Sequence, residues 1–151
     1  MQFGSAGFSM ALRILRYDFA AETDEWDSNW LVVAGEVQEG DRSWRFEGPY
    51  VSTSEASELG AWLRSVTNPR WQPVPLVFLE PNLMVEMLDW GDADAALRAT
   101  FDLEWRPPWA AGDEPYTVDI PCEFDSLLQA ADDWTEDLKR FLYRPGRRAG
   151  S

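Results

Sequence analysis

The chain has 151 residues, and 45% of them are hydrophobic, which predicts one folded domain with a core over about residues 10–142. It has no histidine and one cysteine, Cys122, which excludes an internal disulfide, zinc sites of His and Cys, and Ser–His–Asp or Cys–His nucleophiles. With 27 acidic and 13 basic residues the net charge is −14, which disfavours nucleic acid and anionic membranes as partners.

The charge is unevenly distributed along the chain. The last thirteen residues hold five bases and no acid, so residues 1–138 carry 8 bases against 27 acids, a net charge of −19. The nine tryptophans are too many for the centre of one small core, so some are expected at the surface beside acids, as in interface hot spots. Acidity that only keeps the protein soluble is the alternative.

Residues 1–9 and 146–151 are predicted to be flexible ends. The first ten residues have no basic region and no apolar run of signal-peptide length. No window approaches the roughly 20 apolar residues of a membrane span. We therefore expect a cytoplasmic protein.

Three strands are predicted in the first third of the chain. Residues 10–19 read as a strand whose apolar phase shifts midway, as at a β-bulge. Residues 29–38 and 42–46 form a hairpin through a tight turn at Gly40, and Gly48-Pro49 is expected to end it.

Two helices are predicted. Ser52 and Glu55 form a capping-box signature ahead of a helix over residues 53–66, whose apolar residues recur at helical spacing. A second apolar stripe predicts a helix over residues 124–142, with Asp125 as its N-cap.

Four further strands are predicted between the helices, at residues 76–79, 83–90, 97–106 and 116–120. The resulting order β-β-β-α-β-β-β-β-α predicts an α+β fold, an antiparallel sheet of about six to seven strands with helices covering one face.

The strand over residues 97–106 has the clearest pattern, because apolar and polar residues alternate along it without a break. We expect Phe101, Leu103 and Trp105 to pack under the helices, with the intervening polar residues facing neighbouring strands. Prolines 107 and 108 end the strand. Trp109 follows in the loop after the strand, where the sheet is expected to bury its side chain less than those within the strand.

Catalysis has little support in the sequence. Pairs of acids could hydrolyse a glycosidic bond or hold Mg²⁺, but they lie in loops or alternate along a polar strand face. No phosphate-binding glycine loop is present, and Cys122 lacks a basic neighbour that would activate it. We expect no enzyme activity, metal or cofactor.

Four short motifs resemble the WapI-type immunity proteins of bacterial polymorphic and contact-dependent toxin systems. They are Asp27–Val33 followed by Gly35, Ser43–Phe46, Leu79–Leu83, and Phe101–Ala110, and the resemblance covers roughly residues 11–142. It implies a cytosolic antidote that binds the C-terminal domain of a cognate toxin, often a nuclease, and brings no catalytic residues.

A surface for such a partner is predicted in the acidic loops, because a basic nuclease would associate with it quickly. The candidate contacts are Glu22, Asp24, Glu25, Trp26, Asp27, Asp89, Trp90, Asp92, Asp94 and Trp109. A second group of motif residues is expected to be structural: Asn29, Trp30, Glu80, Asn82, Glu104 and Arg106.

Two alternatives from other classes stay open, a structural or adaptor module without a toxin partner and a carboxylate- or metal-dependent hydrolase. The sequence leaves open whether the protein is a monomer or pairs through an edge strand.

Overall fold

The computed structural model describes residues 1–20 and 24–146, which form an α+β fold. Two four-stranded antiparallel sheets have the orders β1-β2-β3-β4 and β5-β6-β7-β8, so every pair of neighbours is consecutive in the chain. The predicted class is confirmed, with eight strands in two sheets in place of about six to seven in one. The elements are β1 (Gln2–Gly4), β2 (Phe8–Tyr17), β3 (Trp30–Glu39), β4 (Arg42–Ser52), α1 (Thr53–Val66), β5 (Leu76–Val77), β6 (Leu83–Trp90), β7 (Asp94–Phe101), β8 (Tyr116–Glu123), α2 (Phe124–Leu138), and the 3-10 helices η1 (Asp27–Asn29) and η2 (Leu103–Trp105).

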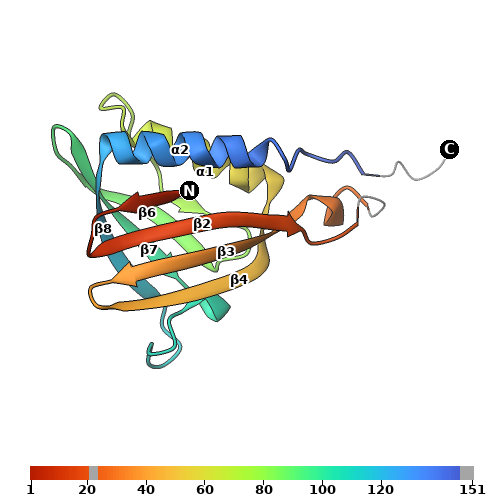
Figure 1. Ribbon diagram of the computed structural model, residues 1–151, viewed down its shortest axis with the longest axis horizontal. Coiled ribbons are helices and arrows are strands. Elements are labelled where there is room, and N and C mark those ends of the chain that lie inside the picture. The colour runs from red at the N-terminus through yellow and green to blue at the C-terminus, as the bar shows by residue number, and fades with distance from the viewer. Residues whose placement is uncertain (21–23, 147–151) are drawn as a thin grey trace.

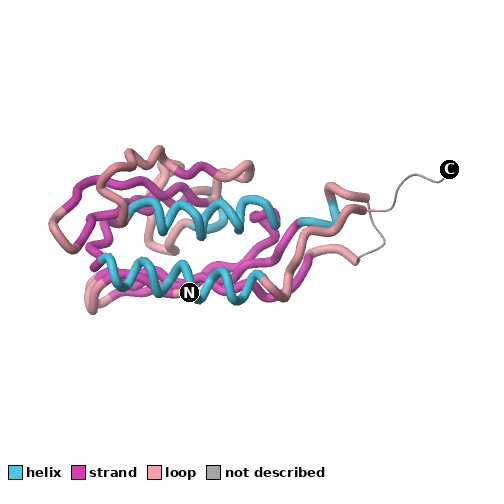
Figure 2. The backbone as a smooth tube through the Cα atoms, turned by 90° about the horizontal axis from the view of Figure 1, so that it is seen from above, coloured by secondary structure: helices cyan, strands magenta, loops and turns pink. Residues whose placement is uncertain are grey.

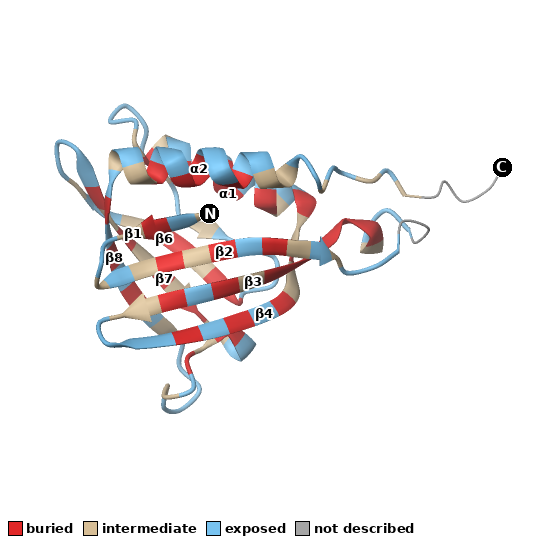
Figure 3. Ribbon diagram, viewed as in Figure 1, coloured by how far each residue is buried: buried red, intermediate tan, exposed pale blue. Residues whose placement is uncertain are grey.

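The first sheet lies in front of the second in Figure 1, and both helices run along one edge of this pair. Figure 2 shows α1 and α2 side by side, and the two helices contact each other. Buried and more exposed residues alternate along β2 and β4 (Figure 3), whereas the first four residues of β3 are all buried. Most of the buried apolar residues of these strands share a core with β6, β7, β8 and both helices. Burial of these shared apolar faces holds the layers together.

Aromatic rings fill the space between the sheets. Phe46 stacks on Trp105 with ring centres 4.4 Å apart, and Trp44 meets Phe101 edge-on at 5.1 Å. Gly35 pairs with Phe46 across the β3–β4 ladder, and a Cβ atom at Gly35 would lie 2.1 Å from the Phe46 ring. The missing side chain at this position is therefore what admits the ring.

The predicted β3–β4 hairpin is present in the first sheet, and its second strand is longer than predicted. The turn at Gly40 is confirmed, with φ +63°, and so is the bulge in β2, between Ile14 and Arg16. The expectation that Gly48-Pro49 ends the hairpin is wrong, because β4 continues to Ser52. Proline is tolerated there because β4 is an edge strand and its register with β3 shifts next to Pro49.

Strand β1 was not predicted. Gln2–Gly4 pairs with β2, and Phe3 is 1% exposed and belongs to the core. The expectation that residues 1–9 lie outside the core is therefore wrong at Phe3. Three residues are too few to show an alternating pattern in the sequence.

The predicted strand over residues 97–106 ends at Phe101, and the remainder turns into η2. A side-chain oxygen of Asp102 accepts a hydrogen bond from the Leu103 N–H at 2.8 Å, which starts a helical turn in place of a ladder. Trp105 is buried as expected, but it packs against Phe46 and Tyr50 of β4 and not under the helices. Leu103 has φ +53° and is 53% exposed, so its predicted place under the helices is wrong. The neighbours of β7 are β6 and β8.

Helix α1 has the predicted bounds and capping box. The Glu55 N–H donates to Ser52 Oγ at 3.2 Å, and the Ser52 N–H donates to Glu55 Oε2 at 2.9 Å. Helix α2 ends at Leu138 instead of residue 142, and its N-cap is Glu123 instead of Asp125. Neither helix, among the residues described, has the length and apolar character needed to cross a membrane.

Candidate functional site

The residues predicted to bind a partner lie on three separate sides of the molecule. In Figure 1 the loop with Asp24–Asp27 lies at one end of the first sheet, and the β6–β7 hairpin with Asp89–Asp94 lies at the other end. Trp109 belongs to the segment after η2, on a third side. Glu22 lies outside the described residues. These groups therefore do not form one continuous surface.

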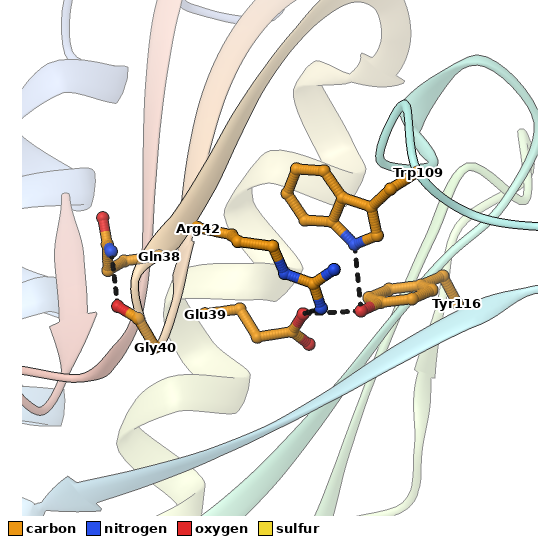
Figure 4. A network of polar contacts seen from close by, with 6 residues as sticks. All are labelled: Gln38, Glu39, Gly40, Arg42, Trp109 and Tyr116. Atoms are coloured by element: carbon orange, nitrogen blue, oxygen red, sulfur yellow. Dashed lines mark hydrogen bonds and ion pairs between the residues drawn. The ribbon is translucent and has the colours of Figure 1, made fainter.

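Trp109 is held by internal contacts on its edge and on one face (Figure 4). Its Nε1–H donates to the Tyr116 hydroxyl at 3.2 Å, and that hydroxyl donates to Glu39 Oε1 at 2.5 Å. The Arg42 guanidinium lies 4.6 Å above the indole and also pairs with Glu39 at 3.0 Å. Trp44 packs edge-on against the same indole at 5.5 Å. Trp109 therefore ties the β3–β4 hairpin to the second sheet.

Two of the four predicted residues of the β6–β7 hairpin, Asp89 and Trp90, make hydrogen bonds inside the protein through their side chains. The Trp90 Nε1–H donates to the Val66 carbonyl at 2.7 Å, which caps the end of α1. A carboxylate oxygen of Asp89 accepts from the Trp90 N–H at 2.9 Å. Asp92 and Asp94 are exposed. This end of the molecule presents acids, but its tryptophan is turned toward the helix.

Asn29 joins the loop before β3 to the C-terminal segment, residues 139–146. Its amide donates to the carbonyls of Glu25 and Arg144 at 2.7 Å, and its Oδ1 accepts from the Arg144 N–H at 2.8 Å and from Thr53 Oγ1 at 3.2 Å. Asn29 is 6% exposed, so all its hydrogen-bonding capacity is used inside the protein. These bonds hold the C-terminal segment against the loop.

The motif residues Asn82, Glu104 and Arg106 also make internal contacts. The buried amide of Asn82 donates to Glu104 Oε2 at 2.9 Å, which links the β5–β6 turn to η2. Arg106 donates to the carbonyls of Ala111 and Gly112 at 3.3 and 2.7 Å. The Glu80 carbonyl accepts from the Asn82 N–H at 2.9 Å and forms the turn between β5 and β6.

A pocket of about 500 Å³ opens beside Trp26. Its walls come from four parts of the chain: residues 25–30, the start of α1 with Glu55, Leu79, and Tyr143 of the C-terminal segment. Trp26 is 63% exposed and meets the buried Trp30 edge-on at 5.6 Å. Leu79 and Tyr143 are 62% and 54% exposed. This Trp26 pocket therefore presents three large apolar side chains to solvent, unlike the ends that hold Trp90 and Trp109.

The carboxylates around the Trp26 pocket have no cationic partner among the described residues. The ion pairs of that part of the chain involve neither Glu25 and Glu55 in the wall nor Asp24 and Asp27 beside it. The nearby Arg144 is turned away, with its guanidinium 3.2 Å from the centre of the Tyr17 ring. The pocket is thus both apolar and acidic.

Of the nine described residues that line this pocket, only Glu25 and Trp26 were among the predicted contacts. Glu55 was interpreted only as a helix cap, Leu79 as part of a strand, and Tyr143 lies beyond the predicted second helix. Nothing local in the sequence brings them together, because long-range contacts place them around Trp26.

Chemistry elsewhere in the molecule is limited. Across residues 1–20 and 24–146, no three Cys, Asp or Glu side chains gather closely enough to hold a metal ion. Cys122 is buried, and desolvation raises the pKa of its thiol to about 12. Its thiol donates to the Ile120 carbonyl at 3.5 Å, so Cys122 is part of the core.

Comparison with known proteins identifies the family. No curated protein matches the chain. The model of the Immunity protein WapI-like family, in contrast, matches residues 1–142, which is nearly the whole chain and both sheets. This agrees with the four motifs, which supply the β3 entry with η1, the aromatic strand β4, the β5–β6 turn, and η2. The chain belongs to the WapI-like immunity protein family, which indicates a non-enzymatic inhibitor protein.

Proposed function

We propose that this protein binds the C-terminal domain of a cognate toxin, a basic nuclease, in the cytoplasm, and blocks it through the acidic surface around Trp26. The observation that carries the proposal is the exposed Trp26 indole, which lies beside carboxylates that have no ion pair within the described chain. Exposed aromatic side chains in a concave site are the usual anchors of protein interfaces.

The charge of the protein supports a basic partner. Residues 1–138 carry 8 bases against 27 acids, and this −19 would repel nucleic acid. A nuclease must bind phosphates and therefore presents Lys and Arg at its substrate site. An acidic protein that covers such a surface competes directly with the substrate and associates quickly.

The test is co-expression with the toxic C-terminal domain encoded beside the gene. Wild-type protein should protect the cells and elute with the toxin domain in one complex. Trp26→Ala should weaken both protection and binding, whereas Trp71→Ala removes an equally exposed tryptophan (57%) away from the Trp26 pocket and should change neither. If the wild-type protein gives no protection and no complex, the toxin-binding proposal is wrong.

If Trp26→Ala protects as well as wild type while a complex still forms, the toxin is bound on another surface. The β6–β7 hairpin, with Asp92 and Asp94, would then be the next surface to substitute.

A further inference from the structure

We infer that the Trp26 pocket receives one arginine side chain of the toxin domain, an inference that rests on the proposed function. The pocket offers an aromatic face for a planar cation and carboxylates to pair with it. No described cation of the protein itself occupies this position.

The aromatic part of the pocket suits a guanidinium group. The Trp26 and Trp30 rings meet nearly perpendicular, at 78°, and both residues line the pocket. A guanidinium stacks flat on indole and gains cation–π attraction, more favourably than the strongly hydrated ammonium of lysine. Leu79 and Tyr143 would cover the aliphatic stem of the arginine.

The carboxylate of Glu55 is held in place by the backbone. Glu55 Oε1 accepts from the Leu79 N–H at 2.6 Å, and its Oε2 accepts from the Ser52 N–H at 2.9 Å. These two bonds fix the side chain and leave further lone pairs on both oxygens. Glu25 is exposed and lines the same pocket. A fixed carboxylate can hold a guanidinium with two parallel hydrogen bonds.

The pocket could instead hold an anion, because the start of α1 forms part of its wall. Free N–H groups at a helix start attract anions. Here the capping box engages the N–H groups of Ser52 and Glu55. With the carboxylates of Glu25 and Glu55 lining it, the pocket favours a cation.

The first experiment measures binding of an arginine derivative to the pocket in the absence of the toxin. The indole N–H signals of the protein are followed by NMR during titration with N-acetyl-arginine amide, up to about 100 mM because single-residue ligands bind weakly. Trp26→Phe assigns the Trp26 signal. We expect a saturable shift at Trp26 and Trp30 and little change at Trp90, which lies at the other acidic end.

The neutral isostere N-acetyl-citrulline amide and inorganic phosphate are the comparison ligands. A response to arginine but not to citrulline supports the inference. Equal responses to arginine and citrulline, a saturable response to phosphate, a Trp90 shift as large as that of Trp26, or no saturable shift would each overturn it.

The second experiment uses the complete complex and matched charge changes. Glu25→Gln and Trp26→Ala should raise the Kd for the toxin domain at least about tenfold, mainly through faster dissociation. Asp92→Asn removes the same charge at the far end and should change the Kd less than about threefold.

The two proposals can fail separately. If wild-type protein forms no complex, the proposed function fails. If the complex forms and Glu25→Gln behaves like Asp92→Asn, only the arginine site is wrong.

Discussion

The aromatic ring of Phe46 determines which residue can occupy position 35. Because a Cβ atom at Gly35 would lie 2.1 Å from this buried ring, Gly35→Ala must displace Phe46, which itself stacks on Trp105 at 4.4 Å. We expect the free energy of unfolding to fall by about 2 kcal/mol, as for other overpacked cores.

Urea unfolding measures this change, and Gly7→Ala is the control. A Cβ atom at Gly7 would meet no atom within 4 Å. The free energy of unfolding of this variant should therefore lie within about 0.5 kcal/mol of the wild-type value. Equal stabilities of the two variants would show that the Phe46 ring moves aside without cost.

Asp119 and Arg98 form a cross-strand pair on the exposed face of β7 and β8. Arg98 donates to the two carboxylate oxygens at 2.7 and 3.1 Å, and this hydrogen bonding lowers the pKa of Asp119 below its ordinary value of 3.8. Because the pKa is lower in the folded state, the pair stabilises the protein above the unfolded-state pKa, and this contribution is lost as the pH falls through the folded-state pKa.

Arg98→Gln should therefore raise the pKa of Asp119 toward 3.8, which NMR titration of the carboxyl group can follow. The difference in stability between this variant and wild type should shrink as the solution is acidified. An Asp119 pKa that does not change in the variant would contradict the pairing.

At the scale of elements, the sequence predicted best those structures that depend on neighbouring residues. The α1 capping box needs only Ser52 and Glu55, and the β3–β4 turn needs only Gly40. Strand β7 was predicted too long because alternation in the sequence does not show that Asp102 captures the next N–H. Helix α2 was predicted too long because residues 142 and 144 bond instead to Tyr17 and Asn29.

Glu104 is expected to stabilise the protein through its hydrogen bond with Asn82, which links the β5–β6 turn to η2. Glu104→Ala leaves the buried Asn82 amide without its partner at 2.9 Å, which should cost about 2 kcal/mol of unfolding free energy. Glu104→Gln keeps an acceptor oxygen and should cost less than about 1 kcal/mol. Urea unfolding of both variants separates these outcomes, and an equal loss in the two would assign the effect to something other than the hydrogen bond.

At the scale of the whole molecule, the candidate site was only partly predictable. The exposure of Trp26 beside acids followed from composition, since nine tryptophans exceed what one small core takes. The pocket did not, because Leu79 and Tyr143 come from distant parts of the chain. Trp90 and Trp109, which were predicted to contact a partner, instead donate their indole N–H groups to hydrogen-bond partners inside the protein.

Under the proposed function, the acids at both ends of the molecule should act together on a distant basic partner, although only one end is proposed to touch it. Residues 1–138 carry 8 bases against 27 acids, and this charge of −19 should steer a basic toxin domain toward the protein from beyond contact distance.

Salt should therefore slow association more than it speeds dissociation. Raising NaCl from about 25 to about 500 mM shortens the Debye length from roughly 20 to 4 Å, and the association rate constant should fall by about tenfold or more. Stopped-flow mixing of the two proteins measures it. Asp92→Asn and Glu25→Gln each remove one charge and should reduce the low-salt association rate similarly, but only Glu25→Gln should speed dissociation. An association rate that is independent of salt would mean that the acidity of this protein plays no part in finding its partner.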